Sequence, residues 1–165
     1  MGKVDVKFNW NEISMFLYDQ EDGGLGGLIR CGEKGGLDTP KTLNAQIANN
    51  KIDISAPNTN LGGLIRLYAI ETINADISGN IMKVDYQEDL GGAIIVGDWG
   101  SDIDCEYPTR DLETYLTMNN NDIQIYTEYD NGGSGGMMRV IGRERTEVTM
   151  SNTNLETTFS PDAWT

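Results

Sequence analysis

Three arginines occupy the same position of a repeated motif. Two consecutive glycines followed by two apolar residues occur four times, at Gly26–Ile29, Gly62–Ile65, Gly91–Ile94 and Gly135–Met138. Three of the motifs continue with arginine (Arg30, Arg66 and Arg139), whereas Ile95 follows the third one. Glycines let a ligand or another backbone approach closely, and guanidinium groups bind carboxylates and phosphates through paired hydrogen bonds. The pattern predicts either an anion-binding row or ion pairs with nearby acidic residues, and the acidity of the chain favours the ion pairs.

Short acidic segments precede several of these glycine pairs and supply the partners for such ion pairs. Together with an aromatic residue beside an inserted loop, they complete the set of candidate ligand-binding residues: Arg30, Arg66, Arg139, Asp22, Asp89, Asp130 and Trp99. The segment carboxylates could also hold a hard cation, but they lack the alternating oxygen spacing of a metal loop. We therefore predict solvated acidic loops, with no metal and no cofactor.

The residue types present argue against an enzyme. The chain has no histidine, which removes the commonest general base and the Ser-His-Asp and Cys-His catalytic arrangements. Cys31 and Cys105 are 74 positions apart and are predicted to be free thiols. Asp102, Asp104 and Glu106 alternate, so a strand there would present three carboxylates on one face. This row could bind Ca²⁺, act as a glycosidase acid–base pair or face solvent, but no second element completes a catalytic site.

Alternating apolar residues predict strands on both sides of asparagine-containing breaks. Because asparagine tolerates the positive φ of tight turns, each pair of strands is interpreted as a hairpin. Residues 109–118 fit either a short helix or a loop entering a strand. The predicted fold is all-β, a single domain of about five β-hairpin repeats with linking Gly-Gly strands, forming a sandwich, a barrel or a repeat array. The approximate repeat boundaries are 3–40, 41–70, 71–112, 113–145 and 146–165.

The overall charge restricts the partners. The 165 residues carry a formal net charge of −14 with no basic stripe, so nucleic acid and anionic membranes are predicted not to bind. The first residues contain no apolar signal segment, and no run approaches the roughly 18 apolar residues of a membrane span. We expect cytoplasmic synthesis without a signal peptide, with later incorporation into a particle left open.

These observations lead to three functional hypotheses from different classes. The first is a non-enzymatic structural or assembly protein of phage or virion type (a tail, capsid or decoration component) that associates with itself or with other structural proteins. The second is a lectin-like carbohydrate-binding module with one glycan site per repeat, built from loop aromatics and acidic segments. The third is an acidic inhibitor or immunity-like protein that engages a basic partner through residues 102–106.

Overall fold

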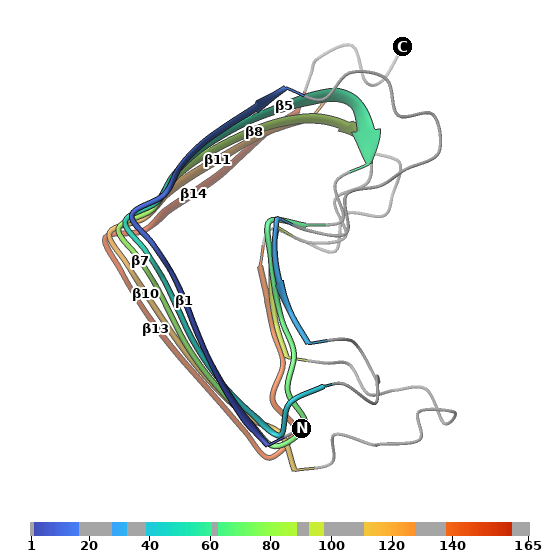
Figure 1. Ribbon diagram of the computed structural model, residues 1–165. Coiled ribbons are helices and arrows are strands. Elements are labelled where there is room, and N and C mark those ends of the chain that lie inside the picture. The colour runs from blue at the N-terminus through green and yellow to red at the C-terminus, as the bar shows by residue number, and fades with distance from the viewer. Residues whose placement is uncertain are drawn as a thin grey trace.

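The chain forms a parallel β-helix whose five described coils each contribute strands to two parallel sheets, and the first four also contribute to a third (Figure 1). The computed structural model describes residues 2–16, 28–32, 39–60, 63–88, 93–97, 111–127 and 138–159, and these residues contain strands and no helix. The predicted all-β class is confirmed. Residues 113–119 form a strand, which decides between the two interpretations of the segment at 109–118.

The three sheets are built from equivalent strands of successive coils. The first sheet contains β1 (Lys3–Asn9), β4 (Thr42–Ala48), β7 (Thr72–Ser78), β10 (Glu113–Asn119) and β13 (Arg145–Ser151). The second contains β2 (Glu12–Phe16), β5 (Lys51–Asn60), β8 (Ile81–Glu88), β11 (Asp122–Thr127) and β14 (Asn154–Phe159). The third, which follows the glycine pairs, contains β3 (Ile29–Cys31), β6 (Ile65–Leu67), β9 (Ile94–Val96) and β12 (Met138–Val140).

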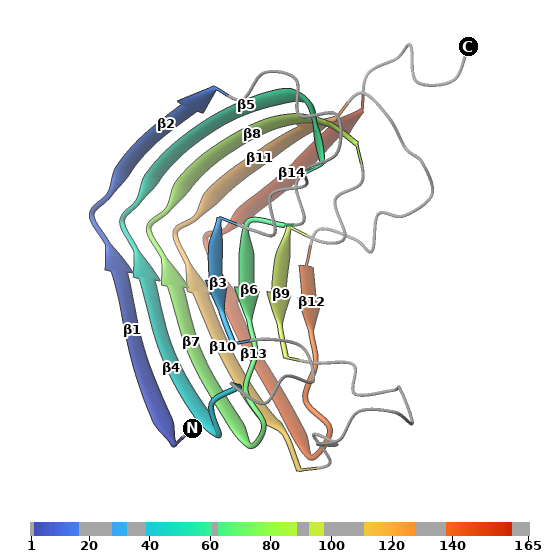
Figure 2. The same cartoon turned by 45° about the vertical axis from the view of Figure 1, so that its right-hand side comes forward.

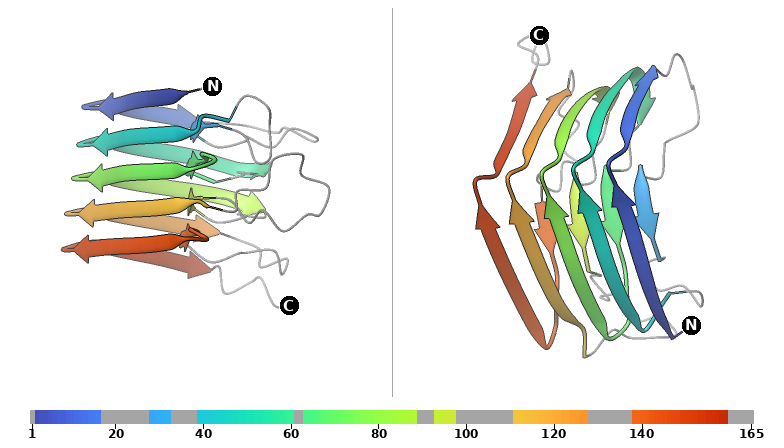
Figure 3. Two further views of the ribbon diagram at one scale, coloured as in Figure 1. Left: turned by 90° about the horizontal axis from the view of Figure 1, so that it is seen from below. Right: turned by 60° about the vertical axis from the view of Figure 1, so that its left-hand side comes forward.

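The hairpin prediction is wrong for the described strands. The two strands that flank each asparagine break belong to different sheets, and every strand pairs in parallel with its counterpart in the next coil. Figures 2 and 3 show the resulting stack, with one layer per coil from the N-terminal to the C-terminal end. The alternation of apolar residues identifies a strand but not its partner, and here each break bends the chain instead of reversing it.

The bend between the first and second sheets uses one residue with positive φ in every coil. Asn49, Asn120 and Asn152 have φ values of 57°, 55° and 46°, and Gly79 has 68°. Asparagine and glycine adopt this left-handed conformation at low cost, so the sequence preference at the breaks has the expected backbone reason. The next residue, asparagine in four coils, turns its side chain to the neighbouring coils.

The interior is filled by inward-facing aliphatic side chains that stack in rows from coil to coil. One row of the first sheet joins Phe8, Ile47, Ile77, Met118 and Met150, one residue from each coil. The side chains in the middle of this row are fully buried: Ile47, Ile77 and Met118. The third sheet lies opposite the first across this core (Figures 1 and 2). Most outward-facing positions carry polar residues, and Phe16, Ile81 and Tyr126 are exposed exceptions on the second sheet.

Trp10 is the exception among the bend residues. Its φ is 62°, a backbone conformation that bulky residues rarely adopt. Its side chain is 79% exposed, so burial of the indole does not compensate for this strain. We expect Trp10→Asn to raise the free energy of unfolding by about 0.5–1 kcal/mol, since left-handed backbone costs most residues about 1–2 kcal/mol. Urea unfolding would measure the change, with Asn49→Trp as the reverse substitution. A Trp10→Asn protein less stable than the wild type would contradict this account.

Candidate functional site

The three repeated arginines lie in one row on the third sheet. Arg30 of β3 pairs in register with Arg66 of β6, and Ile95 of β9 separates Arg66 from Arg139 of β12. Arg66 is half-buried, and its Nε atom is buried with no hydrogen-bond acceptor among the described residues. The repeated motif therefore corresponds to one row of residues in the structure, in which Ile95 interrupts the arginines. Its predicted acidic partners, the aromatic candidate and the alternating acidic row all lie outside the described residues: Asp22, Asp89, Asp130, Trp99, Asp102, Asp104 and Glu106.

Neither thiol nor metal chemistry is indicated in the described part of the chain. Cys31 carries a free thiol, and burial raises its pKa, so less of it is the reactive thiolate at neutral pH. Cys105 lies outside the described residues. Among the residues that the structure describes, no group of three or more acidic, cysteine or histidine side chains could hold a metal ion.

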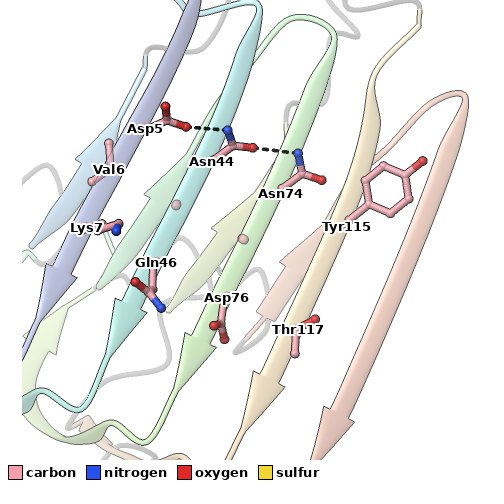
Figure 4. Close-up of a pocket in the computed structure, with 11 residues that line it drawn as sticks. Asp5, Val6, Lys7, Asn44, Gln46, Asn74, Asp76, Tyr115 and Thr117 are labelled. Atoms are coloured by element: carbon pink, nitrogen blue, oxygen red, sulfur yellow. Dashed lines mark hydrogen bonds between the residues drawn. The ribbon is translucent and has the colours of Figure 1, made fainter.

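A groove of about 700 Å³, lined by polar side chains together with Val6, Ala45 and Ala75, runs across the outer face of the first sheet. Within it, Asn44 Nδ2 donates to Asp5 Oδ1 at 2.6 Å, and Asn74 Nδ2 donates to Asn44 Oδ1 at 2.9 Å (Figure 4). These three residues occupy the same position of three adjacent strands, and Tyr115 of β10 occupies it next. The structure thus forms a continuous polar row that no sequence motif had singled out.

Two aspartates, one on each outer face, have pKa values shifted in opposite directions. The amide of Asn44, and then Lys3, lower the pKa of Asp5, whereas burial raises the pKa of Asp85 on the second sheet. Ionised Asp5 therefore stabilises the fold above the unfolded-state pKa of about 4, and this contribution disappears as the pH falls through its lower folded-state pKa. Ionised Asp85 instead reduces stability above its raised pKa.

We expect two isosteric substitutions to separate these effects. Asp5→Asn should lower the melting temperature at pH 7, and the deficit should shrink as the pH falls below the unfolded-state pKa of about 4 and Asp5 becomes protonated. Asp85→Asn should raise the melting temperature at pH 7 and leave it unchanged at low pH. Thermal unfolding followed by circular dichroism between pH 2 and 7 measures both. The same sign of change in the two variants at pH 7 would contradict the assignment.

An asparagine ladder (Asn11, Asn50, Asn80 and Asn121) runs through the bends between the first and second sheets, and all of its members except the half-buried Asn11 are buried. The backbone N–H of Asn50 donates to Asn80 Oδ1 at 3.1 Å, and that of Asn80 donates to Asn121 Oδ1 at 3.1 Å. The side-chain Nδ2 groups of Asn11, Asn50 and Asn80 also donate to the Oδ1 atom of the asparagine in the next coil. The ladder has a direction, because each coil donates to the carbonyl oxygen of the next. Asparagine at every break was its signal in the sequence, although it was interpreted only as a turn preference.

The two ends of the described coil stack leave interior rows uncovered. Val148 and Met150 on β13 are 44% and 42% exposed, although Leu116 and Met118, their neighbours in the same rows, are 2% and 0% exposed. At the opposite end, the inward-facing residues of β1 and β2 are half-buried: Val4, Val6, Phe8, Ile13 and Met15.

The asparagine ladder has an unused hydrogen-bond acceptor at its first coil. Within the described residues, Asn11 Oδ1 at the first coil receives no hydrogen bond, although its amide and backbone N–H both donate to Asn50. At the last coil Thr153 replaces asparagine, and its hydroxyl lies 3.4 Å from Asn121 Nδ2. An unused acceptor thus lies at one end of the stack, whereas the equivalent Oδ1 atoms of Asn50, Asn80 and Asn121 each accept a hydrogen bond from the preceding coil.

Known proteins provide no further guide to the site. Comparisons with family models, with curated proteins and with solved structures find no match to this chain. In the described residues there is no helix long and apolar enough to cross a membrane.

Proposed function

We propose that this protein is a non-enzymatic structural protein whose copies stack head to tail through the ends of the β-helix. The observation that supports the proposal is the complementarity of the two uncovered ends. Parallel edge strands with free N–H and C=O groups readily pair with another chain. A contact between different surfaces of identical copies is heterologous, and it leads to an open filament when, as in the continued stacking of coils, successive copies do not close into a ring. Components of phage tails, capsids and decoration layers serve this kind of role.

Stacking would continue the interior rows from one copy into the next. In the register that all the coils share, Val148 would cover Val6 of a second copy, and Met150 would cover Phe8. On the second sheet, Leu155 would cover Ile13. Fully burying a side chain of this size contributes about 1.5–3 kcal/mol, so these partly exposed contacts favour association.

The asparagine ladder would continue in the same direction. Because each coil donates to the Oδ1 atom of the next, the backbone N–H of Thr153 would donate to Asn11 Oδ1 of the following copy. The polarity of the ladder therefore specifies head-to-tail contact and excludes pairing of two identical ends by this hydrogen bond.

Electrostatic repulsion opposes the same contact and gives it a salt dependence. The shared register places Arg145 beside Lys3 of the second copy and Glu147 beside Asp5. Added salt screens these like charges, as well as the repulsion between copies that each carry −14. We therefore expect self-association to strengthen with ionic strength.

Light scattering after size exclusion tests the proposal. We expect the mass to rise above the 18.2 kDa of one chain as protein concentration increases, with no fixed stoichiometry. The rise should be larger at 0.5 M than at 0.05 M NaCl. A monomer at every concentration and salt level would contradict the proposal, and so would a closed dimer.

The other two hypotheses rest on residues outside the described ranges. The acidic-inhibitor hypothesis depends on residues 102–106. The lectin-like hypothesis, with one site per repeat, depends on the acidic segments and Trp99. Both stay predictions.

A further inference from the structure

We infer that the groove on the outer face of the first sheet binds a neutral, linear glycan that runs along the axis of the β-helix. The groove faces away from the interior and crosses β1, β4, β7 and β10, so it opens on the side of the coil stack rather than at its ends, and Val6 of β1 is the residue that borders both surfaces. This inference goes beyond the assembly role, and it uses different residues from the sites expected in the acidic segments.

The groove presents hydrogen-bonding groups at regular intervals. In the row of Asp5, Asn44 and Asn74, each amide donates toward the first coil, so the Oδ1 atom of Asn74 remains without a donor among the described residues. Successive strands repeat the arrangement about every 4.8 Å. A polymer whose units each carry hydroxyl groups matches this periodicity, because a hydroxyl both donates and accepts.

A parallel row two residues further along the strands adds donors and acceptors. It contains Lys7, Gln46, Asp76 and Thr117, one from each strand (Figure 4). Asn9 holds the carbonyl oxygen of Gln46 at 3.0 Å, while the Nε2 group of Gln46 has no acceptor among the described residues. Cationic and amide donors thus lie beside a carboxylate acceptor and a hydroxyl group. Such a mixed row suits a hydroxylated ligand better than a ligand of one charge.

The charge of this face favours a neutral ligand. Its outward side chains on the five strands carry four negative and three positive groups: Asp5, Asp76, Glu113, Glu147, Lys3, Lys7 and Arg145. The face is therefore nearly neutral, whereas the whole chain carries −14. Polyanions are repelled by the molecule as a whole, and the face offers no excess of either charge to a strongly ionic ligand.

Tyr115 supplies an aromatic surface at one side of the groove. Its hydroxyl donates to Glu113 Oε2 at 3.0 Å, and the guanidinium carbon of Arg145 lies 5.7 Å from the ring centre. These contacts restrict the ring. A large aromatic face combined with a polar edge is suited to the apolar face of a sugar ring and its hydroxyls.

The test uses neutral glucose hexasaccharides with β-1,4, β-1,3 or α-1,4 linkage, titrated by isothermal calorimetry. The protein is used both as the wild type and as the stacking-deficient Val148→Asp variant, so that failure of assembly and failure of glycan binding are distinguished. Tyr115→Ala and Asn74→Ala remove the aromatic surface and the terminal amide. Tyr126→Ala and Gln124→Ala on the outer face of the second sheet, where a separate groove of about 380 Å³ lies, are the matched controls.

We expect at least one hexasaccharide to bind, with affinity reduced tenfold or more by Tyr115→Ala and about three- to tenfold by Asn74→Ala. The two control variants should bind as the wild type does, and Val148→Asp should leave the affinity unchanged. The inference is overturned if none of the three binds, or if the second-sheet variants weaken binding as much as the first-sheet variants. Binding of polygalacturonate or of an extended peptide to the groove, without the neutral sugars, would also overturn it.

Discussion

Replacing Asn80 with alanine is expected to lower the free energy of unfolding by about 3–5 kcal/mol. The fully buried Asn80 side chain accepts hydrogen bonds from the backbone and amide of Asn50, and it donates to Ile47 O at 2.8 Å and to Asn121 Oδ1 at 3.0 Å. Alanine would leave the N–H of Asn50 and the carbonyl of Ile47 unpaired in the interior. Each such group costs roughly 1–3 kcal/mol.

Asn74→Ala is the matched control, because Asn74 also belongs to a row of hydrogen-bonded amides but is exposed. We expect it to cost less than about 1 kcal/mol, since solvent replaces the lost hydrogen bond. Equilibrium urea unfolding followed by circular dichroism compares the two variants. Equal losses of stability in both would show that burial of the asparagine ladder does not contribute to the fold as described.

Placing a carboxylate on the uncovered end of the core is expected to weaken self-association at least a hundredfold. Val148 faces the interior row and is already partly exposed, so Val148→Asp should disturb the isolated chain little. In a stack, the same carboxylate would be buried against Val6 of the next copy, and burying an unpaired charge is strongly unfavourable. Sedimentation velocity over a range of concentrations measures the change in association.

Thr149→Asp adds the same charge to the neighbouring, outward-facing position of β13. It controls for the extra negative charge on an acidic protein. In the shared register this position lies beside Lys7 of the next copy, so we expect little or no loss of association. If Thr149→Asp and Val148→Asp weaken association equally, general repulsion rather than the uncovered core would control it.

The strands and bends could be predicted from sequence, because both depend on local preferences. The alternation of Leu43, Ala45 and Ile47 indicated a half-buried strand, and these residues do face the interior of β4. Asn49, Asn120 and Asn152 indicated positive φ, which the structure has. The glycine pairs likewise led to Arg30, Arg66 and Arg139 in one register row.

The choice of partners could not be predicted in this way. Val4 and Val6 alternate in the same manner whether β1 pairs with β2 in a hairpin or with β4 in the next coil. What separates the two is the residue after the bend: Asn50 and Asn80 bond to each other across 30 positions of sequence. The groove on the first sheet could not be predicted for the same reason, because Asp5, Asn44 and Asn74 come together only when the coils stack.

Mixing two variants that are each blocked at one end tests head-to-tail stacking most directly. Val6→Asp blocks the first coil and Val148→Asp blocks the last coil, while each variant keeps the other end intact. The account predicts that each variant alone is a monomer of about 18 kDa and that an equimolar mixture forms a dimer of twice that mass. Circular dichroism of each variant confirms that it is folded before mixing. A mixture of folded variants that stays monomeric at concentrations where the wild type associates would contradict the account.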